Sequence, residues 1–442
     1  MLKHLNDGYL LRILIILYMN NQFQSLDDFK KSFNKLKETN HFNVKEIPFN
    51  ELDQWGFEDN DECKTMRLVH NSGKFFKIEG IRVKTNFGSL NQWDQPIINQ
   101  PEIGILGILS KKFNGIRYYL MQAKMEPGNV NILQLSPTCQ ATKSNFSRVH
   151  QGNAPPYLEY FIESKSKVII DQLQSEQGGR FLRKRNRNMI IEVEEDVEIL
   201  DNFFWLTLND IKELLKINNF VNMDARSVIS TIPVAENLDN GYKTNKELKS
   251  WIIDQKVKYE LDIEKIPLSK LDWWTISEKS IFQNDRFFSV IGVKVEAGTR
   301  EVTSWTQPMI KDLNIGLIGF IKKKINNIDH YLVQTKVMPG NIDIIDLSPT
   351  VSFSNYQFFI NNKPSPRFFE YFIENKPCYD TLQSEEGGRF YHFQNKNMII
   401  EIDENENIVI PDNYNWMSLN QIMEFMPLGM FNVEARSLIS SL

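Results

Sequence analysis

The chain contains short apolar runs whose length and composition are typical of β-strands. Ile103–Leu109 and Ile116–Ala123 are two such runs, and Asn114-Gly115 lies between them. An Asn-Gly pair between two apolar runs is a strong hairpin signal, because both residues tolerate the positive φ that a tight turn requires. Val168–Leu173 and Met189–Val193 are apolar and rich in β-branched residues, so they predict two further strands.

This pattern occurs twice along the chain. When the sequence is shifted by 212 positions, residues 75–138 align with residues 287–350 without a gap, and 27 of the 64 pairs are identical. The identical segments include Pro127-Gly128-Asn129 and Leu135-Ser136-Pro137-Thr138, and residues 173–181 match residues 382–390 farther along. Repeats of this size form domains rather than solenoid units, so we expect two domains related by a pseudo-twofold axis.

The repeat defines the expected domain boundaries. The first copy covers residues 25–235, the second covers residues 244–442, and a polar stretch joins them. Residues 1–24 have no counterpart in the second copy and predict a helical extension at the N-terminus. Their apolar run, Tyr9–Met19, is too short to span a bilayer, and no signal-peptide cleavage site follows it. This run is either a buried helix or a contact between subunits.

Helices are predicted at equivalent places in both copies. Leu26–Lys37 and Lys246–Lys256 each open a copy with a helical pattern. Thr207–Ile217 is amphipathic, and Asp210 lies three residues after Thr207, as in a capping box; Ser418 begins the equivalent segment. The combination predicts the α+β class, with a mixed sheet and a few helices in each copy.

Composition and missing motifs exclude several classes of protein. Hydrophobic residues make up 41% and charged residues 24%, which is ordinary for a globular protein. The net charge of −5 disfavours general binding to nucleic acid. The 3 cysteines have no zinc or disulfide spacing, which favours a cytoplasmic location. Dinucleotide, P-loop, serine-elbow and HExxH motifs are missing, so we expect no metal and no cofactor.

Polar residues inside strand-like segments are the candidates for chemistry. Gln122-x-Lys124 ends an apolar strand, and Gln334-x-Lys336 repeats it. Alternation along a strand places Gln122 and Lys124 on one face, which indicates a lined cavity or a paired network. The segment 174–180 combines a Gly-Gly pair with an arginine suited to an anionic ligand. Identity between the copies can also reflect packing, turns or structural salt bridges.

The two copies differ in ways that point to one chemical site. The loop over residues 138–150 of the first copy carries lysine, arginine and histidine, and the matching loop over residues 350–356 carries none of them. Met338 also replaces Glu126. We therefore expect the active site in the first copy and an auxiliary or degenerate site in the second.

These motifs resemble those of the NDP-hexose 2,3-dehydratases of deoxysugar pathways. The resemblance rests on residues 122–129, 135–145, 157–161 and 174–181, and it extends over nearly the whole chain. It implies two Nudix-like domains without the metal-binding Nudix box, a homodimer and no cofactor. The implied substrate is dTDP-4-keto-6-deoxy-D-glucose, which would lose water across C2 and C3. The implied partner is a downstream ketoreductase or aminotransferase.

The resemblance also suggests roles for particular residues. Lys124 would stabilise an enolate or bind the diphosphate, and Arg180 and Arg226 would bind phosphate. The candidate acids and bases are Glu126, His150, Tyr157 and Glu176, and the other substrate contacts are Gln122, Asn129, Gln140, Thr142, Lys143, Ser144, Asn145 and Gln174. The second site would consist of Gln334, Lys336, Asn341, Gln383, Glu385, Arg389 and Arg436. A nucleotide-sugar binding module without catalysis and a cofactor-free keto-sugar isomerase or epimerase remain alternatives.

Overall fold

The structure is a computed structural model of the chain. It describes residues 25–60, 65–142, 155–162, 167–233, 241–283, 287–298, 303–362 and 364–442. The expected N-terminal extension and the candidate residues Lys143, Ser144, Asn145 and His150 lie outside these ranges. Among the described residues, no helix has the length and apolar character needed to cross a membrane.

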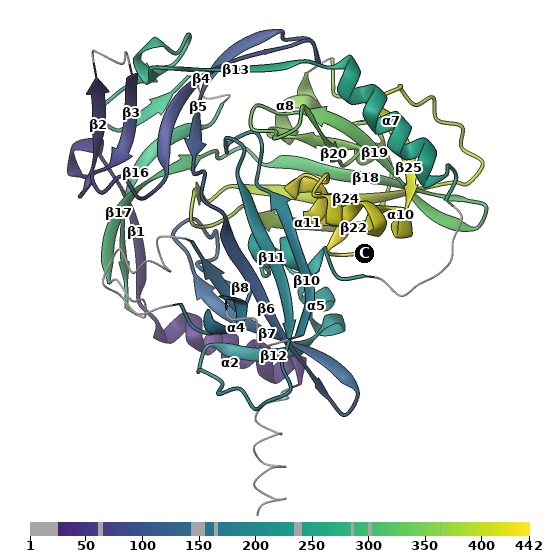
Figure 1. The fold of residues 1–442 in the computed structure, drawn as a ribbon, viewed down its shortest axis with the longest axis horizontal. Helices are drawn as coiled ribbons and strands as arrows, with labels where there is room; N and C mark the ends of the chain where they lie inside the picture. The colour runs from purple at the N-terminus through teal and green to yellow at the C-terminus, as the bar shows by residue number, and fades with distance from the viewer. Residues whose placement is uncertain are drawn as a thin grey trace, which may run out of the picture.

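A mixed sheet of seven described strands forms the centre of the first copy (Figure 1). Its strand order is β10–β11–β6–β7–β12, β8 pairs with β7, and β9 pairs with β6. Strands β6 and β11 run parallel, and the other pairs are antiparallel. The bounds are β6 Gly104–Phe113, β7 Ile116–Met125, β8 Leu133–Ser136, β9 Cys139–Ala141, β10 Lys167–Ser175, β11 Arg185–Glu192 and β12 Phe203–Thr207.

The second copy repeats this sheet. Its order is β20–β19–β18–β24–β22, with β21 on β18 and β25 on β19, and β18 and β24 run parallel. The bounds are β18 Gly316–Ile325, β19 Ile328–Val337, β20 Ile345–Ser348, β21 Val351–Phe353, β22 Pro377–Ser384, β24 Gln394–Ile402 and β25 Tyr414–Ser418. The expected mixture of sheets and helices in two similar halves is therefore confirmed.

The segments with turn and capping signals in the sequence form the predicted elements. Asn114 and Gly115 have φ values of 50° and 83° and join β6 to β7 in a hairpin. Thr207 caps helix α5 with the full capping box, and Ser418 caps α10 in the same way. The bounds of the described helices are α2 Leu26–Thr39, α4 Glu159–Ile162, α5 Leu208–Leu215, α6 Met223–Ile229, α7 Asn245–Lys258, α8 Tyr356–Asn361, α9 Tyr371–Glu374, α10 Leu419–Phe425 and α11 Val433–Ile439, with 3₁₀ turns at Phe49–Glu51, Leu268–Lys270 and Met426–Leu428.

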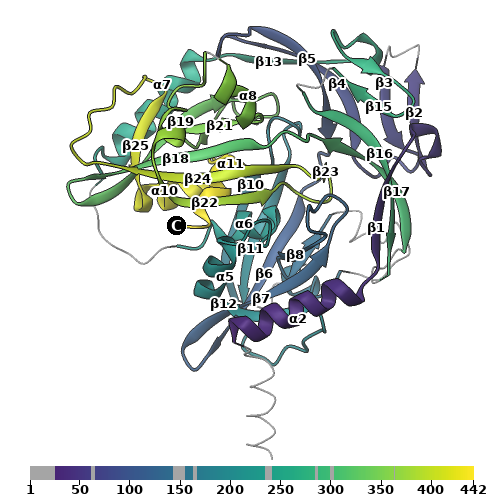
Figure 2. The same cartoon turned by 180° about the vertical axis from the view of Figure 1, so that it is seen from behind.

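Helices cover one face of each large sheet. Phe29 and Phe33 of α2 are buried in the core of the first sheet, together with residues of α5 and α6 (Figure 2). Leu248 and Ile252 of α7 occupy the equivalent core of the second sheet. These pairs are spaced four residues apart, so each helix buries one stripe.

The two copies exchange strands in two smaller sheets (Figures 1 and 2). Strand β1, from the first copy, pairs along its whole length with β16 of the second copy. Strand β13, from the second copy, pairs in the same way with β4 of the first. The bounds are β1 Phe42–Ile47, β2 Trp55–Asn60, β3 Thr65–His70, β4 Lys77–Thr85, β5 Gln92–Asn99, β13 Leu261–Ile266, β14 Thr275–Ile276, β15 Ser280–Phe282, β16 Ser289–Ala297, β17 Ser304–Lys311 and β23 Phe390–Tyr391. The core between these sheets is shared, since it contains residues of both copies.

The Pro-Gly-Asn segments meet the Gly-Gly segments of the other copy. The Gly128 amide donates to the Gly387 carbonyl, and the Gly340 amide donates to the Gly178 carbonyl, each over 2.7 Å. A Cβ atom on Gly128 would lie 1.6 Å from the Phe390 carbonyl oxygen. The identical glycines are therefore required for close contact between the two copies.

Candidate active site

A cavity of about 480 Å³ lies between the first sheet and the crossing segments of the second copy. The first copy supplies one wall from strands β6, β7 and β9 and from the start of α6. The second copy supplies residues 304–307 and 386–389. Because neither copy encloses this space alone, the site that we expected in the first copy belongs to both.

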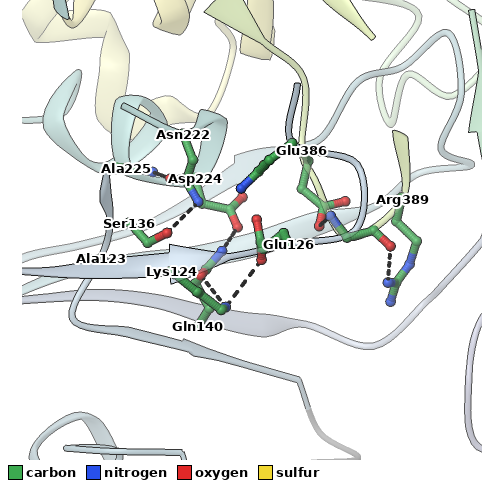
Figure 3. Close-up of polar contacts among 12 residues, drawn as sticks. Ala123, Lys124, Glu126, Ser136, Gln140, Asn222, Asp224, Ala225, Glu386 and Arg389 are labelled. Atoms are coloured by element: carbon green, nitrogen blue, oxygen red, sulfur yellow. Dashed lines mark hydrogen bonds and ion pairs between the residues drawn. The ribbon is translucent and has the colours of Figure 1, made fainter. Parts of the chain in front are cut away.

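Lys124 lies near the end of β7, where its side chain faces the cavity. Its Nζ is 3.2 Å from Glu126 Oε1 and donates a hydrogen bond to Gln140 Oε1. The Gln140 amide in turn donates to Asp224 Oδ2 (Figure 3). The four side chains thus form one polar network across the cavity wall, as the alternation along β7 predicted for Lys124.

Asp224 lies in the first turn of α6, which Asn222 caps. Its side chain lines the cavity although the residue is only 5% exposed. Burial raises the pKa of the Asp224 carboxyl well above its ordinary value, and the nearby carboxylates of Glu386 and Glu176 add to this effect. A raised pKa favours the protonated form of the Asp224 carboxyl, which is the form that can act as an acid.

Glu386 and Arg389 enter the cavity from the segment between β22 and β23 of the second copy (Figure 3). Burial raises the pKa of Glu386 to about 7, and Arg389 opposes the rise. The Arg389 guanidinium lies 4.2 Å from the centre of the Phe76 ring and donates to Gln100 Oε1 over 3.3 Å. Its partner at this point is a neutral amide, so its charge is available to an anionic ligand.

Glu176 completes the acidic part of the cavity. Asn186 Nδ2 donates to Glu176 Oε1 over 2.6 Å. Burial raises the pKa of Glu176, while Arg436 and Lys184 act in the opposite direction. Lys184 is also buried and donates to the Glu102 carbonyl oxygen.

Aromatic residues line another part of the cavity. Trp55, His70, Phe75 and Phe76 contact one another, with ring centres 4.4–6.4 Å apart, and Trp305 of the second copy also lines this space. Such a surface is suited to a flat ring, because aromatic faces stack favourably on other π-systems. The cavity therefore combines an aromatic region, a cationic residue and a group of carboxyls.

The predicted site residues divide into two groups. Lys124, Glu126, Gln140, Thr142 and Glu176 line the cavity together. The lining does not include Gln122, Asn129 or Gln174: Asn129 donates to the Ile132 carbonyl oxygen, and Gln174 donates to the Met426 carbonyl oxygen.

Three further first-copy candidates are not part of the cavity lining. Tyr157 is packed under the sheet, where its hydroxyl donates to the Glu198 carbonyl oxygen over 2.8 Å. Arg180 lies over Phe288, 3.8 Å from the ring centre, with Nη2 3.8 Å from Asp312 of the second copy. Arg180 was predicted to bind phosphate in the first copy, and the crossing of the Gly-Gly segments places it beside residues of the second copy.

Arg226 is the third of these candidates. It is 1% exposed, and its guanidinium donates to the Val221 and Ser384 carbonyl oxygens and to Ser437 Oγ. With these donors engaged inside the protein, Arg226 ties α6 to the second copy and has no free donor face for a phosphate.

The residues expected at a second site have mixed positions. Arg389 lines the cavity that contains Lys124, because the Gly-Gly segment of the second copy crosses to the first. The others have internal partners: Gln334 bonds to the Pro349 carbonyl oxygen, Lys336 to that of Ser352, Asn341 to that of Ile344, Gln383 to that of Leu215, Glu385 to the Asn395 amide and Arg436 to the Ser175 carbonyl oxygen. A ligand site there stays a prediction.

Four acidic residues of the cavity lining were not among the candidates from the sequence: Asp53, Glu102, Asp224 and Glu386. One signal for Glu386 was present, because Gln177 stands at the aligned position of the other copy. A charged residue at only one of two aligned positions favours a role in one site.

A cavity that combines acidic and basic side chains is suited to an enzyme that transfers protons. The chain belongs to the NDP-hexose 2,3-dehydratase family: the family model matches residues 26–232 and again residues 245–442.

Curated relatives agree with the family model. A Saccharopolyspora spinosa protein is 43% identical over 433 residues, which cover 91% of this chain and 88% of the relative. An Amycolatopsis orientalis protein is 40% identical over 91% of this chain and 87% of its own, and a Streptomyces violaceoruber protein is 36% identical over 90% and 93%. All three are named dTDP-4-dehydro-6-deoxy-α-D-glucopyranose 2,3-dehydratase.

Proposed function

We propose that the chain removes water across C2 and C3 of a dTDP-linked 4-keto-6-deoxyglucose in deoxysugar biosynthesis. The names of relatives that match nearly the full chain support this reaction and this substrate. One observation of the structure carries the proposal furthest. The same cavity is lined by Lys124, Asp224 and Glu386. Burial raises the pKa of Asp224 well above its ordinary value and that of Glu386 to about 7.

The cavity has a suitable region for each part of this substrate. The thymine ring would stack in the aromatic region around Trp55 and Phe76, and the diphosphate would bind Arg389. The sugar would then lie against Lys124 and the carboxyls. Glu176, whose ionised form is favoured by Arg436 and Lys184, would accept a hydrogen bond from a sugar hydroxyl.

The side chains can be assigned to the bonds that change. The 4-ketone acidifies the C3 hydrogen, and Glu386, with a pKa of about 7, removes that proton. The Lys124 ammonium stabilises the negative oxygen that develops at C4, while Glu126 holds the ammonium in place. Protonated Asp224 gives its proton to the C2 hydroxyl, and the C2–O bond breaks to release water. The enol that forms tautomerises to the 3,4-diketo-2,6-dideoxy sugar.

The direct test is mass spectrometry of the purified full chain incubated with dTDP-4-keto-6-deoxyglucose. A partner ketoreductase and NADPH trap the unstable diketone. A trapped 2,6-dideoxy-4-keto sugar nucleotide, one oxygen short of the substrate, supports the dehydratase. Unchanged substrate that still stabilises the protein against heat would indicate a binding module. Deuterium uptake from D₂O at unchanged composition would indicate an isomerase or epimerase.

The finer features of the fold are also part of this proposal. Reciprocal contacts, such as β1 with β16 and β13 with β4, support an approximate twofold axis between two Nudix-like units. A homodimer and a downstream ketoreductase or aminotransferase follow from the family resemblance, and a reactive diketone requires an enzyme that consumes it. A cytoplasmic location stays a prediction.

A further inference from the structure

Arg436 is a buried arginine of the second copy that no proposed step uses. It lies in α11 and is 0% exposed. Its Nη1 donates to the Phe431 carbonyl oxygen over 2.6 Å, and its Nε donates to Ser227 Oγ over 3.2 Å. Its Nη2 donates to the carbonyl oxygen of Ser175 in the first copy. The guanidinium therefore joins helix α6, helix α11 and the end of strand β10.

The Ser175 carbonyl oxygen belongs to the peptide that precedes a residue of the cavity lining. The next residue is Glu176, whose side chain lines the cavity, and the chain then crosses to the second copy at Gly178. The direction of the Glu176 side chain depends on the peptide that Arg436 fixes. On the other side of Glu176, Asn186 fixes one carboxylate oxygen.

We propose that Arg436 is a positioning residue of the active site: from the second copy, it fixes the Ser175 peptide and so directs Glu176 into the cavity. This inference rests on the proposed function, since it assigns to Glu176 the hydrogen bond to the sugar described above. It gives the second copy a part in catalysis through a residue that does not touch the substrate.

Charge gives Arg436 a second effect on the same group. Burial raises the pKa of Glu176, and Arg436 is the largest of the influences that lower it. The other charged groups that act on Glu176 or are acted on by it are Lys184 beside it, Glu434 in α11, Asp224 in α6, and Glu385 and Glu386 in the crossing segment. Since most of these groups are acidic, loss of Arg436 would leave Glu176 among like charges and make it hold its proton to higher pH.

The test compares three variants with the wild-type chain: Arg436→Gln, Arg436→Lys and Ser227→Ala. Ser227→Ala removes the acceptor of the Arg436 Nε bond and the donor to Asn188 Oδ1, and it leaves both carbonyl contacts of Arg436 in place. The measurements are kcat and KM from about pH 5 to pH 9 in the trapping assay, and thermal unfolding of each protein.

We expect Arg436→Gln to lower kcat/KM about tenfold at pH 7 and to recover part of this loss at higher pH. Activity requires both Glu386 and Glu176 to lose a proton, so a higher pKa of Glu176 moves the acidic limb of the profile upward by about one unit. Arg436→Lys keeps the charge and should restore the position of the limb. Ser227→Ala should move the limb in the same direction by a smaller amount.

Leu438→Ala provides the matched control, because Leu438 is fully buried in the same helix and only packs in the second core. It should lower the melting temperature and leave the pH limb in place. An unchanged limb in Arg436→Gln and Ser227→Ala, or an equal shift in Leu438→Ala, would overturn the inference. Lack of turnover in the wild-type chain would instead count against the proposed function.

Arg226 is unsuitable as a control, although it mirrors Arg436. Its Nη2 donates to the Ser384 carbonyl over 2.5 Å, two residues before Glu386. A change at Arg226 would therefore disturb the proposed base.

Discussion

Replacement of Lys124 by methionine tests the charge on which the proposed elimination depends most. Methionine keeps the length of the side chain and removes the ammonium that lies 3.2 Å from Glu126. Loss of one preorganised group that stabilises an oxyanion typically lowers kcat about 10²–10³-fold, or about 2.7–4 kcal/mol. Since the ammonium also holds Gln140, and through it Asp224, we expect the loss to reach at least the upper part of that range.

The same change at Lys336 is the matched control. Lys336 stands at the aligned position of β19, and its Nζ donates to the Ser352 carbonyl oxygen over 2.6 Å. Both variants leave buried polar groups without a partner, so each should lose about 1–3 kcal/mol in the free energy of unfolding. Only Lys124→Met should lose turnover, measured as trapped product by mass spectrometry. If Lys124→Met keeps kcat within about tenfold of the wild type, or if Lys336→Met loses as much, the assignment of the chemistry to this cavity is wrong.

Three further outcomes follow from the structure. The kcat of the wild type should rise through about pH 7, because Glu386 must lose its proton before it can act as the base; a flat profile in the trapping assay would contradict this role. Gln100→Asp should raise KM about tenfold or more, since a carboxylate would neutralise Arg389; isothermal titration with dTDP should show the same loss, and unchanged affinity would refute it. Burial raises the pKa of Asp346 to about 7, so the native state holds an extra proton and loses stability as pH rises from about 4 to 7. Asp346→Gln, which copies Gln134 of the first half, should be the more stable form at pH 8 in urea unfolding; a lower midpoint would contradict this reasoning.

The elements that could be predicted from the sequence depend on short-range interactions. The Asn114-Gly115 turn and the Thr207 cap are each specified by residues within four positions, so their patterns were sufficient. The exchange of β1 and β13 is different, because both strands would pair equally well by pattern with a sheet of their own copy. A periodic pattern identifies a strand and does not identify its partner.

The part of the site that lies on strand β7 could be predicted from the sequence. The alternation of β7 predicted a lined cavity or a paired network at Gln122 and Lys124, and of these two residues Lys124 lines the cavity. The arginines were harder, because an arginine identical in both copies is expected equally at a ligand and at a buried junction. Arg226 lies at the junction, and Arg389 lies at the cavity of the other copy. The crossing of the chain at the Gly-Gly segments decides these positions, and it depends on contacts between residues that are far apart in sequence, Gly178 with Gly340 and Gly128 with Gly387.

The exchange of strands has a consequence for the history of this enzyme. Two separate, identical subunits that traded a strand and a glycine-rich segment would always have two identical pockets, because one gene would encode both. A covalent link between the copies removes that constraint and allows one pocket to change while the other stays intact. Glu126 and Met338, which stand at aligned positions of the two copies, are one such difference. A single chain can therefore place different side chains at its two junctions, which two copies of one subunit cannot.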